Sequence, residues 1–135
     1  MTIRDLSRDQ KVSLSLAPAV RTTGTATGTA VDLRGFDGAT VVVSFGAYSD
    51  GTHTPTVVHS MDGESFTTCT YGTDLDGPSN LTAVSGSAGA NTVQQIGYIG
   101  TQRYVAVVMT STSASTGALS AAHVIAGYPH SGPAV

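Results

Sequence analysis

Residues 97–130 read GYIGTQRYVAVVMTSTSASTGALSAAHVIAGYPH and contain two apolar runs on either side of a Ser/Thr-rich turn. The runs, Tyr104 to Met109 and Ala118 to Ala126, have the length and the residue types of β-strands. We expect the two strands to pair as a hairpin and to lie centrally in the fold. Almost none of these side chains carries chemistry, so the stretch predicts a scaffold.

Period-two alternation recurs along the rest of the chain, whereas helical periodicity does not. Residues 12–16 (VSLSL) alternate before Pro18, which predicts a strand at a sheet edge with its serine side exposed to solvent. Residues 39–45 (ATVVVSF) form a continuous apolar run, which is typical of a strand that is buried on both faces or central in a sandwich.

Turn residues mark where these strands end. Asp62-Gly63 predicts a tight hairpin between residues 55–61 and 65–71. Residues 72–91 are rich in Gly, Ser, Asp, Asn and Pro, and they predict a long exposed loop with one short strand. Further strands are expected at residues 29–33, 92–99, 103–111 and 118–127.

About eight strands separated by short turns predict an all-β fold class. The expected architecture is a single-domain, two-sheet antiparallel β-sandwich that is jelly-roll-like. The length agrees, because 135 residues make one ordinary domain. We place the sandwich at residues 12–135 and a flexible N-terminal arm at residues 1–11.

Composition disfavours several classes of function. A formal net charge of −3 with six Lys and Arg residues disfavours nucleic-acid binding, which needs clustered positive charge. No stretch approaches the ~20 apolar residues that span a membrane, and the N-terminus has no signal-peptide core. Charged residues at 11%, aromatic residues at 6% and no Trp leave little from which to build a catalytic centre. We therefore expect a protein made in the cytoplasm, with no nucleic-acid or membrane partner and no enzymatic activity.

The basic residues are distributed unevenly along the chain. All but Arg103 precede Gly35, and most of the acidic residues follow it. One interpretation is ordinary variation in surface charge. The other is a basic arm that contacts an acidic partner surface. The candidate contact residues of this arm are Arg4, Arg8 and Lys11.

The single cysteine and the four histidines are the remaining candidates for chemistry. Cys69 lies in an alternating stretch that is typical of a half-buried strand, and a nucleophilic role would require a nearby base. His53 and His59 share one face of a strand, where we expect structural or surface roles. His123 is expected in the core or an interface, and His130 in a solvated tail.

Several aspartates accompany glycine in turns, as Asx-turn chemistry favours. Asp74-Leu75-Asp76-Gly77 resembles a calcium loop only superficially, because the closing Glu of an EF-hand is missing. Glu64 is the single glutamate, and no nucleophile-elbow, phosphate-loop or dinucleotide motif occurs. The sequence thus predicts no catalytic, cofactor or metal site. The turn aspartates considered are Asp50, Asp62, Asp74 and Asp76.

A set of short motifs resembles a family of small virion proteins of tailed phages and prophages, over roughly residues 12 to 132. The motifs are DLRGFD at residues 32–37, DGTHTP at 50–55, SMDG at 60–63, GYIGTQRYV at 97–105 and GYPH at 127–130. The resemblance implies a head decoration, or cement, protein on the capsid exterior. It also implies a major capsid protein as partner and assembly of this chain as a homotrimer. Residues 1–10 and 72–91 lie outside the resemblance.

These expectations leave alternatives open. The arm Met1 to Lys11 either reaches onto the capsid or is a frayed terminus without a role. A second class of function is a head-fibre or tail-associated module that binds glycans through the 72–91 loop, with Tyr48, Tyr71 or Tyr98 as stacking surfaces. A third, an accessory domain of a secreted enzyme, is disfavoured because the sequence shows no signal peptide.

Overall fold

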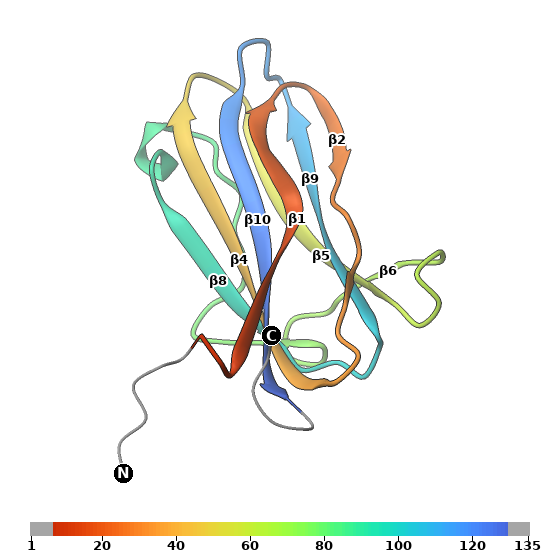
Figure 1. Cartoon of the computed structure of the whole chain (residues 1–135). Helices are drawn as coiled ribbons and strands as arrows, with labels where there is room; N and C mark the ends of the chain where they lie inside the picture. The colour runs from red at the N-terminus through yellow and green to blue at the C-terminus, as the bar shows by residue number, and fades with distance from the viewer. Residues whose placement is uncertain (1–6, 130–135) are drawn as a thin grey trace.

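The computed structural model describes residues 7–129, with the backbone alone at residues 128 and 129. It contains ten strands and one short 3-10 helix (Figure 1). The strands are β1 (Gln10–Arg21), β2 (Gly24–Thr27), β3 (Val31–Asp32), β4 (Phe36–Tyr48), β5 (Thr52–Ser60), β6 (Thr67–Thr68), β7 (Leu75–Asp76), β8 (Val93–Tyr98), β9 (Tyr104–Thr112) and β10 (Ala118–Pro129), and the 3-10 helix η1 is Ser87–Gly89.

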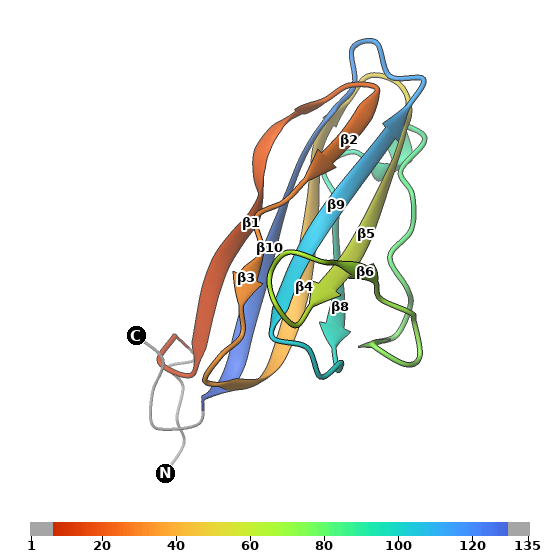
Figure 2. The same cartoon turned by 90° about the vertical axis from the view of Figure 1, so that its right-hand side faces the viewer.

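The strands form two antiparallel sheets that pack face to face (Figures 1 and 2). One sheet has the order β1-β10-β4-β8-β7, and the other has the order β2-β9-β5-β6 with β3 also paired to β9. Four of the pairs are nested along the chain: β1 with β10, β2 with β9, β4 with β8, and β5 with β6. This nesting is the strand order of a jelly roll. The predicted two-sheet sandwich is therefore confirmed. It has ten strands rather than about eight: β3 and β7 lie where short strands were expected, and β2 is an additional strand.

The predicted hairpin of the last two apolar runs is wrong. β9 lies between β2 and β5 in one sheet, whereas β10 lies between β1 and β4 in the other. The chain crosses from sheet to sheet through residues 113–117, where Ser113 and Gly117 have positive φ. Both strands are nevertheless central in their sheets, as expected. A short turn rich in Ser and Gly serves a sheet-to-sheet crossing as well as it serves a hairpin, so the local sequence did not distinguish the two.

The core fills the space between the sheets. On β4, Val41, Val43 and Phe45 point inward and are buried, whereas Val42 and Ser44 on the other face are half-buried. The run at residues 39–45 is therefore a central strand with one face in the core. β9 supplies a matching row from the opposite sheet. The fully buried members of that row are Val105, Val107 and Met109.

β1 lies at a sheet edge, as predicted, but its serine side is not exposed throughout. The register against β10 slips between Leu14 and Leu16, so Ser15 is an extra residue that forms a β-bulge. Ser15 turns inward and is 3% exposed, while Val12 is 60% exposed. The bulge thus reverses the inside and outside assignment that simple alternation predicts.

Ser15 joins the two sheets at the break between β2 and β3. Its hydroxyl donates to the Thr29 carbonyl at 2.9 Å and accepts from the Val107 N–H at 3.0 Å. Gly28 donates its N–H to the Val107 carbonyl at 2.8 Å. A Cβ at Gly28 would lie 2.6 Å from both the Ser15 hydroxyl and the Val107 carbonyl oxygen, so only glycine fits this gap.

The predicted β5 hairpin forms, but its turn is longer than two residues. β6 pairs with the end of β5, and residues 61–66 connect them. The Asp62 carboxylate accepts hydrogen bonds from the Ser65 and Glu64 N–H groups and the Ser60 hydroxyl, and these lower its pKa to about 2. This is the Asx chemistry expected for the turn. The loop lies at the end of the sandwich that also carries the turns at residues 33–35 and 99–103 (Figure 2).

Candidate functional site

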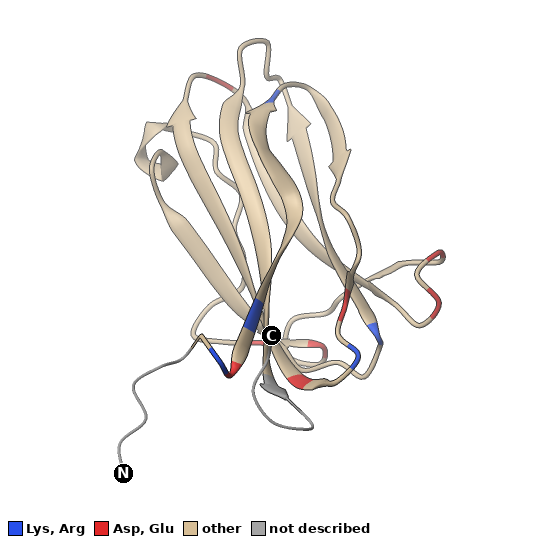
Figure 3. Cartoon of the chain, viewed as in Figure 1, with Lys and Arg blue, Asp and Glu red and all other residues tan. Residues whose placement is uncertain are grey.

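Charged residues gather at one end of the sandwich (Figure 3). We call this the charged end: the start of β1, the β3–β4 turn, the β5–β6 loop, the β6–β7 turn with β7, and the β8–β9 turn. Among the described residues, only Arg21 and Asp50 carry charge elsewhere, near the opposite end. The charged residues of the charged end are Arg8, Asp9, Lys11, Asp32, Arg34, Asp37, Asp62, Glu64, Asp74, Asp76 and Arg103.

Within residues 7–129, the uneven charge along the chain does not produce a basic surface. Basic and acidic residues mix at the charged end, and the acidic ones are more numerous. Of the predicted contact residues, Arg8 precedes β1 and Lys11 lies within it, opposite Ala126. Arg4 lies outside the described residues. Since β1 begins at Gln10, the strand starts before the expected arm boundary at residue 11.

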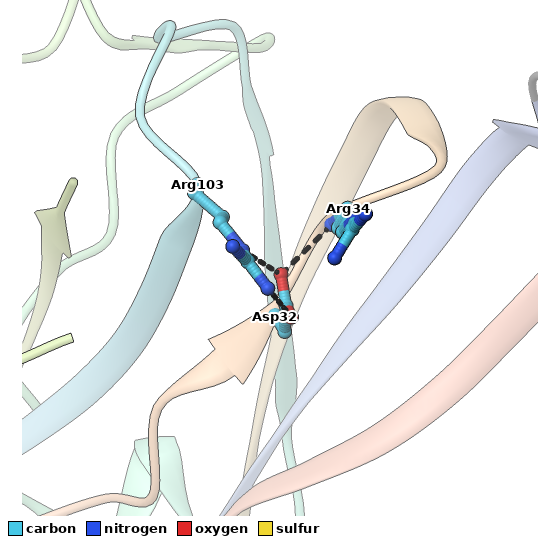
Figure 4. A network of polar contacts seen from close by, with 3 residues as sticks. All are labelled: Asp32, Arg34 and Arg103. Carbon is cyan, nitrogen blue, oxygen red and sulfur yellow. Dashed lines mark hydrogen bonds and ion pairs between the residues drawn. The ribbon is translucent and has the colours of Figure 1, made fainter. Parts of the chain in front are cut away.

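An ion pair joins two turns of the charged end (Figure 4). The Arg103 guanidinium donates to both Asp32 carboxylate oxygens, at 2.8 and 2.7 Å, and the Arg34 N–H donates to Asp32 Oδ1 at 3.0 Å. These contacts lower the pKa of Asp32 to about 2 and raise the pKa of Arg103. The Arg103 guanidinium also lies 5.0 Å from the centre of the Tyr104 ring. The pair thus ties β3 to the start of β9.

A hollow of about 430 Å³ lies beside this ion pair. Arg34 and Arg103 line it together with Phe36, Met61 and Gln102. The hydroxyl of Tyr98, another lining residue, accepts from the Gln102 N–H at 3.0 Å. The hollow therefore leads from the charged end toward polar groups inside the sandwich.

Two histidines are buried and hydrogen-bonded. His53 is fully buried, with Nδ1 2.8 Å from the Ser111 hydroxyl and Nε2 2.9 Å from the Asp50 carbonyl oxygen. It also packs edge-on against Tyr48. Both ring nitrogens have partners, so His53 fits the structural role that was expected. His123 is half-buried on β10, and His130 lies outside the described residues.

His59 belongs to a second buried polar cluster. Its Nδ1 lies 2.9 Å from the Tyr98 hydroxyl and its Nε2 lies 3.4 Å from the Gln102 side-chain nitrogen. The side chains of His59, Cys69 and Asp74 offer ligand atoms that all lie within 4.8 Å of one another. Sequence reasoning missed this group because β5, the residue after β6 and the turn before β7 meet only in the folded chain.

Cys69 is a small buried residue, as expected, with 8% of its surface exposed. Burial raises the pKa of its thiol to about 12, and the Asp74 carboxylate adds to the rise. A nucleophilic cysteine needs the opposite shift. The thiol is therefore protonated at neutral pH in this structure, which disfavours nucleophilic catalysis.

The outward side of the β1-β10-β4-β8 sheet carries no charged side chain among the described residues. Paired residues on neighbouring strands share this side, such as Val12 with Ile125 and Leu14 with His123. We call it the outer sheet face. Several of its apolar side chains are exposed: Val12 at 60%, Leu14 at 45%, Val20 at 55%, Leu119 at 41% and Val93 at 66%.

The 72–91 loop is the last candidate region. It borders an open hollow of about 670 Å³ whose lining includes Asn80 and Gln94 but no aromatic side chain. The Gln94 side-chain amide accepts a hydrogen bond from the Thr82 N–H and donates one to the Thr82 carbonyl, and so holds the loop to β8. Of the predicted stacking residues, Tyr98 is buried, Tyr48 is half-buried and Tyr71 is 40% exposed.

No helix within residues 7–129 has the length and apolar character needed to cross a membrane. A scan against models of known protein families finds no match to this chain, and a comparison with curated protein sequences finds none either.

Proposed function

We propose that this protein is a non-enzymatic structural component of a phage virion, which decorates the outer surface of the head and bridges capsomers. The observation that carries the proposal is the separation of two surfaces, an uncharged outer sheet face with exposed Val and Leu side chains and a charged end. Exposed apolar patches on soluble proteins commonly mark protein interfaces. The jelly roll, a fold that recurs in capsid proteins, agrees with this role by analogy.

The outer sheet face is the surface through which we expect copies of this chain to associate, as a homotrimer. In a cyclic trimer each subunit contacts its two neighbours through two different patches, and patches without charge can meet with little desolvation cost. Three linked subunits then bind a capsid through three contacts at once, so weak individual contacts give strong overall binding.

The charged end is the surface through which we expect the trimer to contact the major capsid protein. Arg8, Lys11 and Arg34 lie there with acidic neighbours, so the contact would match a surface of mixed charge. Arg4 and the rest of the arm would extend this contact from the start of β1.

Association through the outer sheet face can be tested with Leu14→Glu. Leu14 is 45% exposed and lies opposite His123 near the middle of the sheet. Met61→Glu is the matched control, because Met61 is 66% exposed but lies in the β5–β6 loop. In light scattering coupled to gel filtration we expect a trimer for the wild type and Met61→Glu, and a monomer for Leu14→Glu. A monomeric wild type would refute the trimer.

Decoration can be tested by adding the purified chain to particles that were produced without it and counting bound copies per particle. Deleting residues 1–9 removes the part of the arm that precedes β1 and leaves the strand intact, since β1 begins at Gln10. We expect this deletion to reduce occupancy while the sandwich stays folded. Unchanged occupancy would refute the role of the arm, and failure of the wild type to bind would refute decoration.

A second candidate function is a head-fibre or tail-associated module that binds glycans. The open hollow beside the 72–91 loop favours it, because amide and hydroxyl groups line that hollow. The burial of Tyr98 and the lack of an aromatic lining residue weaken it. Saturable binding on a glycan array, lost on Asn80→Ala, would favour this function over decoration.

A further inference from the structure

We propose that His59, Cys69 and Asp74 form a binding site for a zinc-type divalent cation, which goes beyond the virion role proposed above. The three side chains present imidazole nitrogen, thiol sulfur and carboxylate oxygen, with all ligand atoms within 4.8 Å of one another. This mixed set suits Zn²⁺, which binds all three ligand types, better than it suits the all-oxygen preference of Ca²⁺ or Mg²⁺.

The backbone holds each ligand in place. The Cys69 N–H donates to the Val57 carbonyl at 2.9 Å, which fixes the cysteine beside β5. Thr70 and Asp74 close the next turn, since the Asp74 N–H donates to the Thr70 carbonyl at 2.8 Å and Asp74 Oδ2 accepts from the Thr70 N–H at 3.0 Å. His59 is fixed by β5 itself, opposite Thr67 of β6.

The separation of the ligand atoms needs only a small adjustment. Ligands at 2.0–2.3 Å from a tetrahedral zinc ion lie about 3.3–3.8 Å apart. The longest separation in the cluster therefore has to shorten by about 1 Å. Rotation of the Cys69 and Asp74 side chains can supply this movement without a change in the backbone.

The surroundings of the cluster favour a cation. Cys69 is 8% exposed and His59 is 5% exposed, and within residues 7–129 the Cys69 thiol makes no hydrogen bond. Asp74 forms no ion pair with a described Lys or Arg side chain, unlike Asp32 with Arg103. A buried thiol and a carboxylate side by side repel each other once the thiol ionises, and a divalent cation removes that repulsion.

Neighbouring groups can orient the histidine for binding. The Tyr98 hydroxyl lies 2.9 Å from His59 Nδ1, and the two rings pack edge-on with their centres 5.7 Å apart. Such an outer hydrogen bond fixes the orientation of the ring. The Gln102 side-chain nitrogen, 3.4 Å from Nε2, is the other neighbour of the ring, and Gln102 is half-buried beside the hollow of the charged end.

Binding has a defined proton balance. The Cys69 thiol releases one proton to solvent and the resulting thiolate bonds the metal, while Asp74 binds as the carboxylate and His59 as the neutral imidazole. Three protein ligands leave the fourth tetrahedral position to water. The bound ion would join β5 to the segment that leads into β7.

The test uses the full chain without a histidine tag, reduced and freed of metal by a chelator. Titration with Zn²⁺ in two buffers of different ionisation enthalpy should give one ion and about one released proton per chain. Titration with Co²⁺ should give the charge-transfer absorption of a thiolate–cobalt bond. The proposal is overturned if the wild type binds no stoichiometric Zn²⁺, or if bound Co²⁺ shows no thiolate band.

Variants separate this site from adventitious metal binding. We expect Cys69→Ser to abolish the cobalt band, and Cys69→Ser and Asp74→Asn each to weaken Zn²⁺ binding at least tenfold, because loss of an outer-shell partner alone costs ~10–100-fold. Asp76→Asn and His123→Gln are matched controls of the same residue types outside the cluster and should bind as the wild type does. Equal weakening by Asp76→Asn and Asp74→Asn, or full affinity in Cys69→Ser, would overturn the site. The wild-type cobalt spectrum decides the question even if a variant does not fold.

Discussion

Ser15 lies on the edge strand β1, yet replacing it by Ala should strongly destabilise the fold. Ser15 is 3% exposed, and its hydroxyl makes two hydrogen bonds, to the Thr29 carbonyl and from the Val107 N–H. Alanine would leave the buried Val107 N–H without a partner, at a cost of about 1–3 kcal/mol, and would remove the hydrogen bond to the part-buried Thr29 carbonyl, worth about 0.5–1.5 kcal/mol. Because the variant no longer desolvates a hydroxyl on folding, we expect a combined loss of about 2–4 kcal/mol.

This loss is large on the scale of domain stability, which is typically about 5–15 kcal/mol. A chain of 135 residues unfolds with an entropy of roughly 0.28 kcal/mol/K near its midpoint. A loss of about 2–4 kcal/mol therefore corresponds to a decrease in the thermal midpoint of about 7–14 °C.

Urea unfolding followed by circular dichroism measures the effect, with an unchanged slope indicating that the same surface unfolds. Ser13→Ala is the matched control, because Ser13 lies on the same strand, is half-buried and makes no side-chain hydrogen bond within the described residues. We expect that control to change stability by less than about 0.5 kcal/mol. If Ser15→Ala is no more destabilising than Ser13→Ala, then the bulge does not stabilise the sandwich as described.

Three further predictions follow from the same structure. Gly28→Ala should destabilise the fold by about 1–3 kcal/mol, because the new Cβ would meet Ser15 and the Val107 carbonyl. Gly86→Ala is the control and should not destabilise it, because the space around Gly86 is open. Equal unfolding midpoints of the two variants would contradict the steric reasoning. Asp32 and Asp62 have pKa values of about 2 in the folded protein, below the unfolded-state pKa of ~3.9. The stability that these carboxylates contribute is therefore fully present above pH ~3.9 and is lost as the pH falls toward 2. The thermal midpoint should decrease over this pH range, and less steeply in Asp32→Asn. The Cys69 thiol, buried and with a pKa of about 12, should react with a thiol reagent much more slowly in the native protein than in urea, and rapid native labelling would show that the thiol is accessible.

Local sequence patterns predicted the strands better than their partners. Apolar runs gave β4, β9 and β10 with their approximate bounds, because a strand in a sandwich must present alternate side chains to the core. Whether successive strands pair or cross to the other sheet depends on contacts between distant segments. The crossing between β9 and β10 was therefore missed, although both strands were placed centrally.

Period-two alternation in the sequence could not predict features that depend on single residues. One extra residue at Ser15 reverses the inward side of β1, and nothing in VSLSL indicates where the register slips. His59, Cys69 and Asp74 each had a local interpretation as a strand or turn residue. Their proximity depends on Tyr98 and on β5–β6 pairing, which join residues far apart in the sequence.

The position of β10 between β1 and β4 also bears on the order of events during synthesis. β1 and β4 are both made early, yet neither has its main neighbour until residues 118–129 have left the ribosome. Contacts between segments so distant in the chain close slowly. The nascent chain must therefore keep two apolar strands apart from other chains until β10 has been synthesised, and this sheet is expected to form only after residues 118–129 emerge.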